Sequence, residues 1–503
     1  MALVPNEGTP VKPETSDGSE RAIGCTYHTH HNQSEIRKLW VELGAQHQIK
    51  VIYEHRLGDV EMNGKKIQEL RLDYAPPTSN GCPAASVQKT NALQVKADVF
   101  IDASYEGDLM AKAGVSYVVG RESRDEYNES LAGQCNLQVF DISPYVIPND
   151  PNSGLLSMID LEPFKQGAAS RHINAYNFRL RWTEDGTPVP ALGRIDREKY
   201  ALVMRALEQN RKLISWPHVN YARHNMISGG IPGRQADYPD ADWPERSAIW
   251  QEWIDHVKTM NALTGNKMGL IKGEYPESND FPNSLYIRQG RRMVGQYVLT
   301  QHDLMLQTDI HHPIGLAYHP LDIYPPRLMA TPDGKVANEG AVMVMVSPGP
   351  YQIPYESLTP KKDECSNLLV PVCTSSTHIA MAAIRIEVTY MIMGEASGIA
   401  AVRALEENKA MQDISMSGLK DALVRVGMIL EWDGTSYGNE FVKNGSVYAR
   451  NAHRTKHSED YKKRPYKTLW KGKRKRSEMW FPLRTDKWEP KQSAKTRAAQ
   501  SAK

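Results

Sequence analysis

The sequence is short of cysteine, with 5 among 503 residues, and these lie far apart at positions 25, 82, 135, 365 and 373. No C-x-x-C pair occurs, which excludes the usual ligand patterns of zinc ribbons and iron–sulfur clusters. An odd number of distant cysteines fits free thiols in a reducing compartment. We therefore expect a cytoplasmic protein with free thiols.

Long apolar runs are also absent, since none approaches the roughly 18 residues that a membrane-crossing helix needs. Residues 1–22 are polar and Pro-rich and lack the order of a signal peptide, so we expect a disordered leader and no membrane partner. A content of 40% apolar and 24% charged residues is ordinary for a globular protein. The length indicates two domains or one elaborated domain.

No G-x-G occurs among the 35 glycines. A strand, a G-x-G-x-x-G turn and a helix form the unit that usually holds the pyrophosphate of a dinucleotide. Gly229, Gly230 and Gly233 precede Pro-rich loop sequence and do not stand between a strand and a helix. The sequence as given therefore contains no standard dinucleotide-binding turn.

Positive charge is concentrated at the C-terminal end, where residues 454–503 hold 17 Lys or Arg against 5 Asp or Glu. We expect residues 436–503 to be a basic, disordered tail that is dispensable for folding. Basic residues interleaved with Tyr466 and Trp470 could bind nucleic acid or an anionic surface, but a solvated extension is the preferred interpretation. Elsewhere we expect no nucleic-acid partner.

Hydrophobic periodicity gives a coarse secondary structure. Near the N-terminal end we expect a helix over 35–43, a strand over 49–57, a hairpin at Asn63-Gly64 and a strand running from 93 into a turn at 104. Further on, the pattern favours helices over 196–208, 244–263 and 289–306. A strand over 367–373 and a small-residue helix over 387–407 follow.

Two segments combine a buried strand with a turn of small residues. In residues 99–108 (VFIDASYEGD) the strand ends at small residues and a helix begins, so backbone N–H groups could meet a ligand. The alternative is an ordinary strand–turn–helix, with Ser104 as the N-cap and Gly114 ending the helix. Residues 367–407 carry a Ser/Thr-rich turn and then the small-residue helix, for which close helix packing is the alternative.

Together these segments resemble the FAD-dependent oxidoreductase family whose members are described as xanthan-lyase-like or like the flavin subunit of heterodisulfide reductase. Further resembling blocks are INAYNFRLRWT (173–183), the DYPDADW–ERSAIWQEWIDHVKTM stretch, LYIRQGRRMVGQYVLTQHDL (285–304) and residues 353–387, so the resemblance covers about residues 23–435. It implies an α/β fold: an incomplete Rossmann-like FAD-binding domain (23–124 and 351–435) with an inserted α+β substrate domain (125–350). The first βαβ unit of that family is missing from the sequence as given, so we expect a truncated reading frame or a lost FAD anchor, and FAD binding that is weak or absent.

The resemblance also implies site residues. The cofactor-side positions would be Asp102, Ala103, Ser104, Thr374, Ser375, Glu387 and Val388. His378 would exchange the proton that accompanies hydride transfer, and Arg385 would bind a substrate carboxylate or hydroxyl. Arg291, with Arg288 and Arg292 on one helix, would add positive charge. A structural histidine and ion-paired arginines are the alternatives.

No metal site is predicted. Cys25, His28, His30 and His31 have no established ligand spacing and are interpreted as a polar loop. We further expect strand 368–373 to pair in parallel with strand 95–101, which would bring Asp102 and Thr374 to one crevice. The expected function is hydride transfer between FAD and a small polar, sugar-like substrate. The alternatives are a remnant that binds no FAD and a tail-mediated binding protein.

Overall fold

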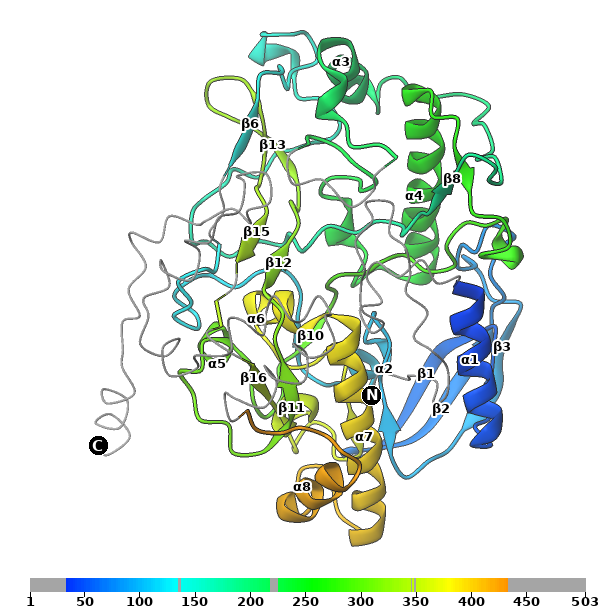
Figure 1. Cartoon of the computed structure of the whole chain (residues 1–503), viewed down its shortest axis with the longest axis vertical. Helices are drawn as coiled ribbons and strands as arrows, with labels where there is room; N and C mark the ends of the chain where they lie inside the picture. The colour runs from blue at the N-terminus through cyan, green and yellow to red at the C-terminus, as the bar shows by residue number, and fades with distance from the viewer. Residues whose placement is uncertain (1–32, 134–136, 218–224, 345, 348–349, 433–503) are drawn as a thin grey trace, which may run out of the picture.

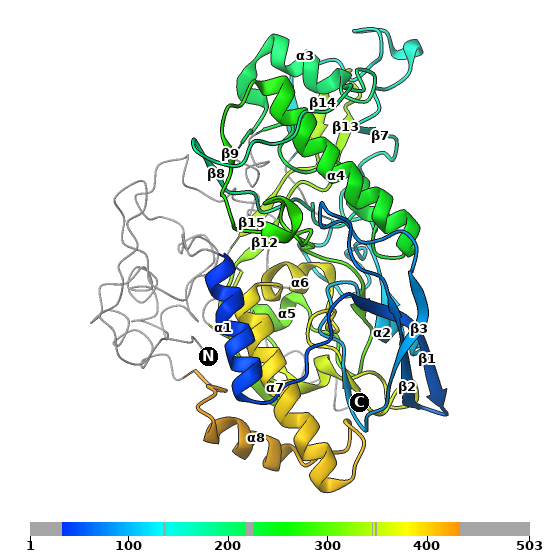
Figure 2. The ribbon, with the colours of Figure 1, turned by 90° about the vertical axis from the view of Figure 1, so that its right-hand side faces the viewer.

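A computed structural model describes residues 33–133, 137–217, 225–344, 346–347 and 350–432 (Figure 1). The expected leader and basic tail lie outside these residues, as do Cys25, His28, His30 and His31. The fold is mixed α/β with several small sheets. Helices α7 (Glu387–Glu407) and α8 (Met416–Arg425) lie toward one end and α3 (Ala201–Gln209) and α4 (Trp243–Thr264) toward the other, with α6 (His378–Ile384) near the middle (Figures 1 and 2).

The N-terminal part forms helix α1 (Gln33–Gln46) and an antiparallel sheet of β1 (His55–Asn63), β2 (Lys66–Tyr74) and β3 (Lys89–Val95). The predicted hairpin is present, with Asn63 opposite Lys66 and Gly64 at a φ of 60°. The strand expected over 49–57 begins only at His55. Glu54 has a φ of 60°, which interrupts an extended chain, and the apolar residues just before it are exposed.

A short parallel pair lies beside this sheet, formed by β4 (Phe100–Ile101) and β17 (Leu368–Leu369). Asn367, just before β17, links this pair to strand β2. Its side-chain NH2 donates to the Ile67 and Asp98 carbonyls, and its side-chain oxygen accepts from Ile67 N. Phe100 and Leu368 are buried together with Ile67 in one hydrophobic cluster. The parallel pairing predicted from the two apolar strands is confirmed.

Helices α6 (His378–Ile384), α7 (Glu387–Glu407) and α8 (Met416–Arg425) pack on the antiparallel pairs β11 (Pro313–Ala317) with β16 (Tyr351–Pro354) and β12 (Leu321–Ile323) with β15 (Val342–Val344). The small-residue helix occupies the predicted range. A side chain at Gly315 of β11 would lie 2.3 Å from Ile392, so glycine lets α7 approach this strand closely.

The opposite end contains α3 (Ala201–Gln209), α4 (Trp243–Thr264), the pair β8 (Trp182–Thr183) with β9 (Gly269–Leu270), and the sheet β6 (Gln138–Phe140), β14 (Val336–Asn338), β13 (Leu328–Ala330), β7 (Ile159–Asp160). Helix α4 matches its prediction. The Asp242 side chain accepts from Glu245 N at its start, and Gly265 ends it at a φ of 62°. Helix α3 starts later than predicted because the Asp196 side chain accepts from Glu198 N and Lys199 N and forms a turn.

The helix predicted over 289–306 is wrong. The segment forms β10 (Arg292–Met293), which pairs with β5 (Tyr117–Val118), then a loop, then the short helix α5 (Gln301–Leu304). Its backbone N–H groups donate hydrogen bonds to a distant segment, from Met293 N to Cys373 O and from Leu299 N to Ser375 O. A side chain at Gly295 would lie 2.4 Å from the Thr359 carbonyl. Tertiary hydrogen bonds therefore replace helical ones.

None of the described helices is long and apolar enough to cross a membrane. Cys82, Cys365 and Cys373 are buried free thiols, as expected for these three positions. The β11–β16 pair joins residues on both sides of the expected boundary at 350, and the division into domains stays a prediction.

Candidate functional site

The turn after β4 is organised by the buried side chain of Asp102. Its Oδ1 accepts from Ser104 N at 3.1 Å and Ser104 Oγ at 2.6 Å, while Oδ2 accepts from Met110 N at 2.9 Å. Helix α2 (Asp108–Lys112) then starts with Gly107 as its N-cap, so the expectation of Ser104 as N-cap is wrong. The Ser104 hydroxyl instead accepts from Gly107 N at 3.0 Å and supports the turn. Gly114, at a φ of 75°, follows the helix end as predicted.

This turn meets the segment after β17 and the start of α7. The Cys373 thiol lies 3.4 Å from the Tyr105 carbonyl, and a side chain at Gly107 would come within 3.0 Å of Cys373 Sγ. The Tyr105 ring contacts the Tyr390 ring edge-on, with centroids 5.9 Å apart. Ala103, Ser104 and Val388 are exposed around this junction. The Asp102 turn therefore contacts the residue that precedes Thr374 and a residue near the start of α7, and a shared cofactor site at these positions stays a prediction.

Thr374 and Ser375 lie beneath this surface and are fully buried. The Thr374 hydroxyl donates to Ser357 O at 2.7 Å, and the Ser375 hydroxyl accepts from Gly295 N at 2.9 Å. Both side chains therefore hold neighbouring loops in place. Their contact with a cofactor stays a prediction.

Arg291 belongs to a buried ion-pair network behind the Asp102 turn. It donates to Asp108 at 2.7 Å and to Asp240 at 2.8 Å, and Arg246 of α4 binds both oxygens of Asp108. Burial raises the pKa of Glu106, which borders the same network, although Arg246 opposes that shift. Arg291 thus fixes the start of α2, and its catalytic role stays a prediction.

Arg292 is the member of the expected arginine cluster that reaches the His378 segment. Its guanidinium donates to Ser376 O at 2.6 Å and to Gly120 O at 2.8 Å, and it pairs with Glu122. Arg288 points elsewhere, with its guanidinium 4.1 Å from the centre of the Tyr324 ring. The three arginines do not share a helix, because residues 288–293 contain no helical residue and Arg292 belongs to strand β10.

His378 is the first residue of α6, where the Thr377 side chain accepts from Ala380 N as the N-cap. Its backbone N–H donates to Glu122 at 2.9 Å, and its ring Nδ1 is buried without a hydrogen-bond partner among the described residues. Burial, followed by the positive charges of Arg292, Arg121 and Arg385, holds the pKa of His378 well below its usual range. The imidazole is therefore neutral at physiological pH.

A small cavity of about 10 Å³, with room for about one water molecule, lies beside this histidine. Its polar lining is His378, His172, Arg121 and Glu339, and its apolar lining includes Leu131, Ile323, Val342 and Ile379. Arg121 and Arg327 both pair with the buried Glu339. Arg385, at the other end of α6, forms an ion pair with Asp322 of β12 at 3.1 Å. The cavity lining thus combines a neutral imidazole, fixed charge and apolar walls.

The comparison with protein families agrees with this geometry. A family model described as FAD dependent oxidoreductase matches residues 9–423. The chain belongs to this family. No curated protein and no solved structure gives a match. Membership implies FAD binding in general and FAD-dependent oxidoreductase activity, and the mixed α/β fold with small sheets is consistent with it.

Two features at the start of α7 are compatible with FAD, the cofactor of this family, and the contact itself stays a prediction. Glu387, in the first turn of α7, has a buried Oε2 without a hydrogen-bond partner among the described residues, so it can accept from a ligand hydroxyl. No side chain caps α7, so its first N–H groups can face developing negative charge. The exposed backbone at Ala103 and Ser104 adds a surface that a flat ring could approach.

No sequence pattern points to Glu129, a fully buried carboxyl group that contacts Thr377. Its Oε1 accepts from Thr377 Oγ1 at 2.6 Å and from Gln301 N at 2.7 Å, while Oε2 is buried without a partner among the described residues. Burial raises the pKa of Glu129 to about 7. Its surroundings in the sequence, YNESLAG, read as an ordinary polar loop, and only tertiary packing buries it.

Proposed function

We propose that this chain oxidises a hydroxyl group of a small polar, sugar-like substrate with FAD as the hydride acceptor. The observation that carries the proposal is the neutral His378, whose Nδ1 is unpartnered among the described residues and which lines a cavity shared with Arg121. The family supplies the redox class. The choice of a sugar-like substrate is part of this proposal.

Bound FAD supplies a two-electron acceptor for the hydride that leaves the substrate carbon. His378 takes the hydroxyl proton as the carbinol becomes a carbonyl, which a neutral ring nitrogen can do and a protonated one cannot. Arg385, held by Asp322, provides positive charge at the far end of α6 for a substrate oxygen. Glu387 and the uncapped start of α7 would hold the cofactor.

The first test is a titration of the purified chain with FAD, followed by the visible absorbance of the flavin and by the melting temperature. We expect saturable binding and bleaching of the flavin when a sugar or sugar alcohol is added anaerobically. A correctly folded chain that neither binds FAD nor reduces it would overturn the proposal in favour of a remnant that binds no FAD.

The residue test is His378→Gln, which keeps a polar side chain but removes the proton acceptor. We expect kcat to fall by about 100- to 10,000-fold, as loss of a general base does, with KM and FAD affinity little changed. His47→Gln, at an exposed histidine on the loop after α1, is the matched control and should leave kcat unchanged. Equal rates for the two variants would exclude His378 as the base.

A further inference from the structure

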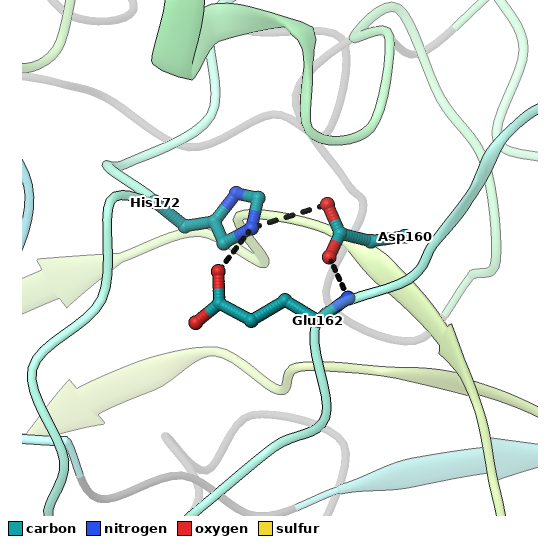
Figure 3. Close-up of side chains that lie close together, drawn as sticks. All are labelled: Asp160, Glu162 and His172. Atoms are coloured by element: carbon teal, nitrogen blue, oxygen red, sulfur yellow. Dashed lines mark hydrogen bonds and ion pairs between the residues drawn. The ribbon is translucent and has the colours of Figure 1, made fainter.

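Three side chains that the proposed oxidation does not use converge on one point in the sheet-rich end of the molecule (Figure 3). Asp160 ends β7, Glu162 lies two residues later, and His172 follows in the next loop. His172 Nε2 is 3.1 Å from Asp160 Oδ2 and 3.5 Å from Glu162 Oε2. One ligand atom from each residue lies within 4.8 Å of the other two.

His172 itself points to a ligand. Its side chain is fully buried, yet neither ring nitrogen makes a hydrogen bond with any described residue. The 3.1 Å contact between His172 Nε2 and Asp160 Oδ2 therefore does not have the geometry of a hydrogen bond. A buried, unpaired imidazole aimed at two carboxylates is costly unless something binds between them.

The neighbouring groups orient both carboxylates. Asp160 Oδ1 accepts from Arg327 at 2.8 Å and from Glu162 N at 2.8 Å, which leaves Oδ2 facing His172. Glu162 Oε1 accepts from the Ser170 hydroxyl at 3.2 Å, which leaves Oε2 facing the same point. Outer partners that hold one oxygen and present the other are the usual support of metal ligands.

The separations fit a small transition-metal ion. Ligand atoms at about 2.0–2.2 Å from a tetrahedral ion lie about 3.3–3.6 Å from one another. The separation from His172 Nε2 to Glu162 Oε2, 3.5 Å, falls in that range, and the 3.1 Å to Asp160 Oδ2 lies just below it. One imidazole nitrogen with two carboxylate oxygens suits Zn²⁺ or Mn²⁺, whereas Mg²⁺ and Ca²⁺ prefer oxygen ligands alone.

Charge and access permit a cation here. Arg327 is shared between Asp160 and the buried Glu339, and Arg121 also pairs with Glu339. Arg171, the residue before His172, pairs with Asp237. The arginines around His172 are therefore each paired with carboxylates. Glu162 is 41% exposed whereas His172 is fully buried, so an ion can enter from the Glu162 side.

We propose that Asp160, Glu162 and His172 form a binding site for a divalent transition-metal ion such as Zn²⁺. Three protein ligands leave at least one coordination position for water or a substrate oxygen. His172 also lines the cavity next to His378, so the metal site borders the proposed proton acceptor. This proposal does not depend on FAD binding.

The test is a calorimetric titration of the chelator-treated full chain with Zn²⁺, and separately with Mn²⁺, together with melting temperatures. We expect one saturable site and a higher melting temperature with the metal. Glu162→Gln should weaken binding by at least about tenfold, because loss of even an outer partner costs about 10- to 100-fold. Ser170→Ala should weaken it by about tenfold for the same reason.

The control is Glu245→Gln, which removes a half-exposed carboxylate on α4 that does not face His172. It should bind Zn²⁺ like the unsubstituted chain. His172→Gln should abolish saturable binding, and its metal-free melting temperature shows whether it folds; if it does not fold, Glu162→Gln decides. No saturable binding overturns the proposal. Equal affinity for Glu162→Gln and Glu245→Gln also overturns it, because the ion then binds elsewhere, for instance at Cys25 and its neighbouring histidines.

Discussion

Replacing Glu129 by Gln should stabilise the protein at alkaline pH and leave it almost unchanged near pH 5. The Glu129 carboxyl is buried, Oε2 has no partner among the described residues, and burial raises its pKa from 4.5 to about 7. Glutamine has nearly the same shape as protonated Glu, and its oxygen can accept from Thr377 and Gln301 as Oε1 does. The variant therefore imitates the protonated form at every pH.

The sign and size follow from proton linkage. Because the folded-state pKa lies above the unfolded one, this carboxyl stabilises the native state fully below about pH 4.5, and the contribution is lost as pH rises through about 7. At about 1.4 kcal/mol per pH unit, the loss is about 3 kcal/mol. By pH 8 the unsubstituted protein bears that cost and the Gln variant does not.

The assay is urea unfolding of both proteins at pH 5, 6, 7 and 8, with the difference in unfolding free energy taken at each pH. Groups common to both proteins cancel in that difference, so it isolates Glu129. Glu126→Gln, which removes a charge at an exposed position three residues earlier, should give a small difference that does not vary with pH. A Glu129→Gln difference that is flat across this range would refute the reasoning.

Two further substitutions test the packing that positions the site. Arg246→Met should lower the unfolding free energy by about 3–5 kcal/mol, because it removes one of the two guanidinium groups that pair with Asp108 and the one whose charge stabilises ionised Glu106, and urea unfolding measures it. An effect below 1 kcal/mol would mean that Asp108 is satisfied by Arg291 alone. Trp253→Ala should cost about 3–5 kcal/mol in the same assay, because the indole is fully buried in the core beneath α4; a melting temperature that stays the same would contradict that.

The sequence was sufficient where local pattern and burial agree. Helix α7 carries Ala396, Ala400 and Ala404 on its buried face and was predicted over its whole length. The β4–β17 pairing could also be predicted, because two short apolar strands that each end in a small-residue turn need each other to bury both faces. In both cases the local sequence pattern of each segment indicates that its side chains are buried.

The predictions fail where contacts with segments distant in the sequence determine the local structure. Residues 289–306 have helical periodicity, but Met293 N and Leu299 N bond to the 373–375 segment, which no local pattern reveals. Glu129 and the Asp160, Glu162, His172 set were missed for the same reason. A carboxyl group becomes a candidate only when the fold buries it, and D-x-E followed by a distant His matches no common ligand spacing.

The charges around residues 376–378 support the site assignment by a separate route. Glu122, Glu129 and Arg292 are all buried against this short segment, and His378 is held neutral there. Burying charge is expensive, and a segment selected for stability alone would be lined by apolar side chains. Perturbed titratable groups concentrate at functional sites for this reason. The same segment follows the strand that pairs with β4, so the charge distribution and the sheet topology both direct attention to residues 373–385.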